Sequence, residues 1–162
     1  MAAAATEGLL SLLVMSHNRF TYGLEQVPED RLNWSPGGSA KTPLQLAGSV
    51  AGFLTFVAAM VADGRMPERS GDPPAAPETR PEARRRLDAA FANLQQAVAN
   101  QTDESLARTV TAPWRAEIPV RDFLWMVASV VGYWQGQLNY LQLAYGDTNA
   151  NIPPDWGQEA AA

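Results

Sequence analysis

The sequence predicts an all-α protein, a four-helix bundle, on three observations. Four long segments carry apolar residues at the 3.6-residue spacing of an amphipathic helix, and few segments alternate as strands do. A proline-rich stretch between the second and third segments is long enough to let these two helices run in the same direction. The 162 residues suit a single domain with its own core, and the lack of cysteine excludes disulfides and thiolate chemistry.

The first predicted helix covers about residues 6–26. Its inward side includes the chain's only histidine, and the stripe is Leu10, Leu13, His17, Phe20 and Leu24. Pro28 ends this helix. Residues 36–39, which read Pro-Gly-Gly-Ser, are expected to form a loop.

The second predicted helix has Thr42 as its N-cap and Pro43 at the first helical position, where a missing N–H costs nothing. It ends near Asp63 and Gly64. The expected apolar stripe is Leu46, Val50, Phe53, Val57, Met60 and Val61. Residues 65–81 contain five prolines, too many for a regular element, so an extended connection is expected there.

The third predicted helix spans about residues 81–100, and a short helical turn with an extended link follows over residues 102–114. Its inward residues are Leu87, Phe91, Leu94 and Val98. The last predicted helix spans residues 119–145, with Gln137 beside an inward stripe of Phe123, Val127, Val130, Trp134, Leu141 and Tyr145. The bundle domain is expected to cover residues 1–147, followed by an irregular tail over residues 148–162.

Composition narrows the classes of function. The net charge is −5, and the one basic cluster, at residues 80–86, lies among acidic residues as a solvated helix face does, so nucleic-acid binding is disfavoured. The N-terminus has no basic region before its short apolar run, so no signal peptide is expected. No run reaches the roughly 18 apolar residues of a membrane span. We therefore expect a cytoplasmic protein with no membrane partner.

The end of the chain carries a family resemblance. From Ala112 onward, the sequence APWRAEIPVRDFLWMVASVVGYWQGQLNYLQLAYGD resembles the closing helix of the DinB-like superfamily of bacterial four-helix bundles. Upstream, NRFTYGLEQVPEDRLNW and KTPL are similar to the end of that family's first helix and the start of its second. The resemblance covers roughly residues 9–147. It implies an up-down-down-up bundle that often pairs as a homodimer.

The resemblance also implies where a divalent metal would be held. In that family one histidine follows the start of the second helix, and two more lie four residues apart on the closing helix. The matching positions in this chain are Ser49, Val130 and Trp134, which offer at most one weak hydroxyl ligand. Because catalytic zinc sites use three protein ligands, we expect no metal at the family site and no cofactor.

Two of these three positions have a second interpretation. Ser49 either bonds back to the carbonyl of Gln45 or offers its hydroxyl to a ligand in a residual pocket. Val130 is expected to be core. Trp134 either fills the volume that a metal would occupy or forms an aromatic wall for an organic ligand.

Other polar residues are also candidates for a functional site. His17 is expected to be hydrogen-bonded or half-buried, or else to face a pocket beside Tyr133 or Gln137. Gln137 either crosslinks helices or points into a cavity, since a buried amide needs partners. Asn139 and Tyr140, with Tyr133, suit an interface between chains.

Three hypotheses of function follow. The first is a DinB-like bundle that has lost the metal site and acts as a small-molecule-binding or protein-interaction module. The second is an enzyme of the family's general kind, a metal-dependent hydrolase or thiol-dependent S-transferase, using unrecognised ligands. The third is a structural or regulatory dimer with a filled core. A pocket between the first, second and last long helices separates the first hypothesis from the third, and metal analysis separates the second from both.

Overall fold

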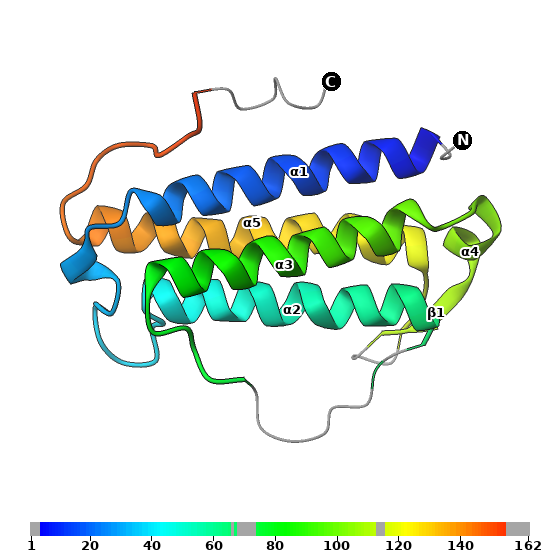
Figure 1. Cartoon of the computed structure of the whole chain (residues 1–162), viewed down its shortest axis with the longest axis horizontal. Coiled ribbons are helices and arrows are strands. Elements are labelled where there is room, and N and C mark those ends of the chain that lie inside the picture. The colour runs from blue at the N-terminus through cyan, green and yellow to red at the C-terminus, as the bar shows by residue number, and fades with distance from the viewer. Residues whose placement is uncertain (1–3, 66, 68–73, 113–115, 155–162) are drawn as a thin grey trace.

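The computed structural model describes residues 4–65, 67, 74–112 and 116–154. Within these residues four long helices lie side by side, and Figure 1 shows their arrangement. They are α1 (Ala4–Glu25), α2 (Pro43–Asp63), α3 (Arg80–Ala99) and α5 (Val120–Ala144). The shorter elements are η1 (Glu29–Arg31), α4 (Asp103–Ala107), β1 (Thr109–Thr111) and β2 (Glu117–Pro119). The prediction of an all-α four-helix fold is confirmed.

Contacts between helix ends give the direction of each helix. The start of α3 adjoins the end of α1, because the Arg80 guanidinium donates to the Val27 carbonyl. The end of α5 adjoins the same end of α1, because Gln142 Nε2 donates to the Gly23 carbonyl over 3.1 Å. In Figure 1, α1 and α5 therefore run one way along the bundle, while α2 and α3 run the other way.

The ends of α2 follow the capping chemistry read from the sequence. The Thr42 hydroxyl accepts a bond from the Gln45 amide N–H over 3.2 Å, and the Gln45 side-chain oxygen accepts one from the Thr42 N–H over 3.0 Å. At the other end Gly64 adopts a left-handed conformation with φ of 66°, which glycine adopts without strain. The predicted N-cap Thr42 and the predicted end of the helix near Gly64 are confirmed.

The helix α2 is apolar over almost its whole length. From Pro43 to Ala62 it carries no charged residue, so by length and composition it is apolar enough to cross a membrane. More than half of its most apolar window is buried against the rest of the chain, as the core helix of a bundle is. This property alone is weak evidence for a membrane span.

A small β-hairpin at the start of α5 was not predicted. β1 and β2 pair antiparallel with Val110 opposite Ile118, and the Val120 N–H donates to the Arg108 carbonyl over 2.9 Å. Each strand has three residues, so neither offers the longer alternation by which a strand is recognised. The hairpin replaces the extended link expected before the last helix.

The predicted inward stripe of α5 is partly wrong in phase. Val130, Trp134 and Tyr145 are only half-buried. The buried residues of the helix are Val120, Phe123, Leu124, Val127, Val131, Gln135, Leu138, Leu141 and Gln142. After its first turn α5 has no charged residue to mark its solvent side, so apolar spacing alone did not fix which side faces inward. Leu10 of α1 and Phe53 of α2, which were also expected to face the core, are half-buried as well.

Candidate functional site

A groove of about 950 Å³ lies where the loop before α2 meets the outer side of α5. One wall comes from residues 36–41 and the start of α2, and the other from the second half of α5. In Figure 1 these segments meet at the end of the bundle where α2 begins and α5 ends. The side chains that shape the groove include Lys41, Leu46, Tyr133, Trp134, Gln137 and Tyr140.

The α5 wall of the groove is aromatic, with a glycine in its middle. Trp134 packs edge-on against Phe53 of α2, with 5.3 Å between ring centroids, so it is fixed between two helices. Tyr133 is 66% exposed and Tyr140 65% exposed, so both rings are available to a ligand. Between them Gly136 leaves the helix backbone uncovered, since a Cβ there would meet nothing within 4 Å.

The opposite wall of the groove contributes a positive charge, the ammonium of Lys41. Lys41 Nζ donates to Ser49 Oγ over 2.6 Å, and Ser49 Oγ donates to the Gln45 carbonyl over 2.9 Å. The second of these bonds is the one expected from the sequence. Among the described residues Lys41 forms no ion pair, and it is the only charged residue that lines the groove.

The structure separates the five residues that the sequence placed around a possible pocket. Trp134 and Gln137 line the groove. Ser49 is not part of the lining, but it is bonded to Lys41, which is. Val130 is half-buried on α5 and is not part of the lining. His17 contacts α3 instead, through Asp88.

The donor atoms at the family metal positions do not fit a divalent ion. Ser49 Oγ already carries an ammonium at 2.6 Å, and Val130 and Trp134 offer no lone pair for coordination. Within the part of the chain that the structure describes, no three His, Asp or Glu side chains gather as a metal-binding group.

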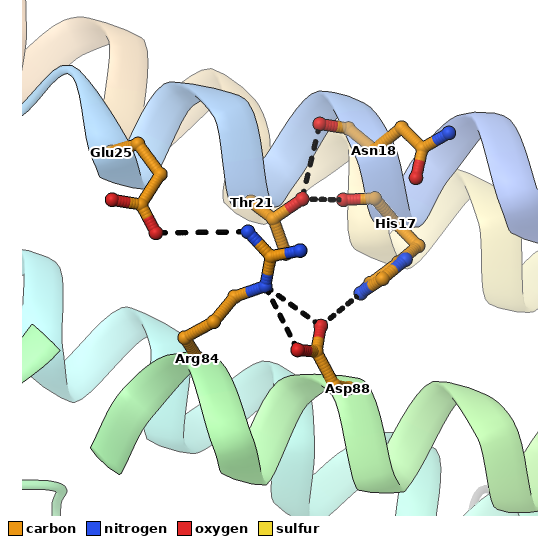
Figure 2. Close-up of polar contacts among 6 residues, drawn as sticks. All are labelled: His17, Asn18, Thr21, Glu25, Arg84 and Asp88. Atoms are coloured by element: carbon orange, nitrogen blue, oxygen red, sulfur yellow. Dashed lines mark hydrogen bonds and ion pairs between the residues drawn. The ribbon is translucent and has the colours of Figure 1, made fainter. Parts of the chain in front are cut away.

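The single histidine belongs to a polar network between α1 and α3, shown in Figure 2. His17 Nε2 lies 2.7 Å from Asp88 Oδ1, and Arg84 Nε donates to the same carboxylate over 2.8 Å. Arg84 reaches Glu25 of α1 at 3.6 Å. Burial lowers the pKa of His17, and the bond to Asp88 only partly offsets this effect. The neutral ring then donates its Nε2 proton to Asp88, which ties the two helices together.

Two buried amides were missed by the sequence reading. Gln142, 1% exposed, donates to the Gly23 carbonyl and crosslinks α5 to α1, the role considered for Gln137. Gln135, 4% exposed, donates to Asn139 Oδ1 over 2.8 Å, so Asn139 is half-buried and bonded within its own helix. Both glutamines lie seven residues apart on the inward side of α5, a spacing visible once the phase of the helix is known.

Comparison with known proteins supports the resemblance. The sequence model described as the DinB superfamily matches residues 12–159. The chain belongs to the DinB superfamily. No curated protein matches this DinB chain.

Several solved structures have a similar fold. A DinB-like protein, YjoA, from Bacillus subtilis superposes with a TM-score of 0.69 at 13% identity, covering 90% of this chain and 96% of that one. A variant of a mycothiol-dependent maleylpyruvate isomerase superposes with a TM-score of 0.60 at 18% identity, covering 82% of this chain and 60% of that one. At such identities the likeness concerns the fold alone.

Proposed function

We propose that this DinB-superfamily chain binds a small organic molecule in the groove beside α5, without a metal ion. The observation that carries the proposal is the groove itself, whose volume of about 950 Å³ lies within the range of ligand pockets, roughly 300–1,000 Å³. Its lining combines three aromatic rings with a few polar groups, the usual composition of such sites. A bundle that acted only as a filled structural core would not need this surface.

The alternative is a metal-dependent hydrolase or thiol-dependent S-transferase that uses other ligands. It requires about three protein donors around one ion, and the donor set at Ser49, Val130 and Trp134 does not provide them. Elemental analysis of the purified protein tests this directly. Near one zinc or nickel per chain, unaffected by substitution of His17, would favour the enzyme over the binding module.

A matched pair of glycine substitutions tests the binding site. Gly136→Leu should fill the groove floor, whereas Gly52→Leu on α2 adds the same side chain at an exposed position where a Cβ also meets nothing within 4 Å. A screen of neutral aromatic fragments by ligand-observed NMR should find binders that Gly136→Leu loses and Gly52→Leu retains. Binders that survive Gly136→Leu, or a screen without binders, would contradict the proposal.

We propose also that two copies of the chain pair through the first half of α5. Trp125 and Met126 are exposed on this helix, at 45% and 41%, and no charged residue follows them on α5. Exposed apolar surface of this kind marks protein contacts, and it lies outside the groove lining. Because members of this family often form homodimers, a second copy of the chain is the expected partner.

Light scattering tests this pairing. The chain should scatter at twice its mass of 17.5 kDa at micromolar concentration, and a Trp125→Glu, Met126→Glu double variant should scatter as one chain. Arg85→Glu, an exposed change on α3, serves as the control and should leave the mass unchanged. A single-chain mass for the unmodified protein would refute the dimer.

A further inference from the structure

We infer that the groove beside α5 selects aromatic carboxylates, with the Lys41 ammonium as the counter-ion of the ligand. This inference rests on the proposed function and adds the ligand's chemical class to it. It is drawn from three features of the groove: its single charge, the anchoring of that charge, and the spacing of its aromatic rings.

The charge of the groove is positive in a chain whose net charge is −5. At physiological salt the field of distant carboxylates is screened within about 8 Å, so an anion inside the groove responds mainly to the nearest charge. That nearest charge is Lys41, which has no carboxylate partner among the described residues. A ligand carboxylate therefore supplies the ion pair that the described residues leave open.

The ammonium is held in place before any ligand arrives. Its bond to Ser49 Oγ is 2.6 Å long, and that oxygen is fixed in turn by its bond to the Gln45 carbonyl. A lysine ammonium has three donors, so two remain for a carboxylate. Anchoring reduces the loss of side-chain freedom that ordinarily weakens an exposed ion pair.

The aromatic residues of α5 are spaced to receive a flat ring. Tyr133 and Tyr140 lie seven residues apart on one side of the helix, about 10.5 Å along its axis. Carbon contacts are about 3.5 Å, so an interval of about 10.5 Å is too wide for one ring to touch both phenols and leaves room for a ring against one of them. Gly136 lies between the two tyrosines and leaves the floor free of a side chain. The ring of the ligand lies there, and its carboxylate points toward Lys41.

Calorimetric titration with two matched probes tests the inference. 2-Naphthoate and 2-naphthylmethanol have the same aromatic body and differ in charge. The unmodified protein should bind the naphthoate about fivefold more tightly, the effect of one surface ion pair near 1 kcal/mol. Lys41→Met should remove that preference, whereas Arg85→Met, a change of an exposed arginine on α3, should keep it.

The outcomes separate this inference from the proposed function. Equal binding of both probes that Gly136→Leu abolishes would overturn the charge selection and leave the binding site standing. A preference for naphthoate that survives Lys41→Met, or no binding of either probe at millimolar concentration, would also overturn it. Lys41→Gln provides a second charge-free variant, and thermal melting of each variant verifies that the fold is intact.

Discussion

Two glycines of α2, Gly48 and Gly52, lie one helical turn apart and should respond oppositely to the same change. A Cβ at Gly48 would lie 2.9 Å from Pro77 Cδ and 3.6 Å from Ala76 Cα. A Cβ at Gly52 would meet nothing within 4 Å. Alanine at each position therefore tests whether the segment before α3 packs along the first half of α2.

The expected difference in the free energy of unfolding follows from two effects. Alanine in place of glycine inside a helix stabilises by about 1 kcal/mol, and Gly52→Ala should show this gain in full. At Gly48 the same gain is opposed by overpacking of about 1–3 kcal/mol, because the Pro77 ring is buried and too rigid to turn aside. Gly48→Ala should thus be less stable than Gly52→Ala by about 2 kcal/mol, or about 4–8 °C in melting temperature for a chain of this size.

Urea unfolding followed by circular dichroism measures both variants against the unmodified protein. A Gly48→Ala, Pro77→Ala double variant should recover most of the loss, since it removes the ring that the new methyl group meets. Equal gains at Gly48 and Gly52 would show that the Pro77 segment does not rest on α2, and the packing argument would fail.

Two further predictions concern polar groups of the core. Because burial lowers the folded-state pKa of His17 below its ordinary 6.5, protonation favours the unfolded chain, so the free energy of unfolding should fall as pH drops from about 7 to 5.5. Urea midpoints should show this slope, and His17→Gln should lack it; a variant that keeps the slope would assign it to another group. Gln142→Met removes the bond to the Gly23 carbonyl and should destabilise by about 1–3 kcal/mol, whereas exposed Gln96→Met should stay within about 0.5 kcal/mol in the same assay. Equal melting temperatures for these two variants would contradict the role given to Gln142.

The sequence was sufficient for the elements whose polar and apolar sides differ. In α3 all four predicted inward residues are buried, because charged residues on the remaining sides leave one side to the core. The cap at Thr42 was equally readable, since its signal is local to a few residues. In α5 charge is confined to Arg121 and Asp122, so no charged residue marks the solvent side of its second half, where two of the polar residues are themselves buried.

The groove depended on information that lies outside any one segment. The family pattern points to Trp134 and Gln137 as site residues. Lys41 enters that pattern only as part of the start of the second helix. Its relation to Tyr140 arises because a loop and a helix far apart in the chain meet at one end of the bundle. Tertiary packing determines which distant residues lie close together. The spacing of residues within one segment does not predict it.

The bond between Lys41 and Ser49 also bears on how this chain can change during evolution. A histidine introduced at position 49 would enter a space next to an ammonium that now lies 2.6 Å from the serine oxygen. That positive charge repels a divalent cation, so we expect Ser49→His, Val130→His and Trp134→His together to hold metal poorly until Lys41 is also replaced. No single change at positions 41, 49, 130 or 134 is expected to create a metal site. The change at Trp134 alone removes its packing against Phe53. Metal binding at these positions would therefore need all four changes together.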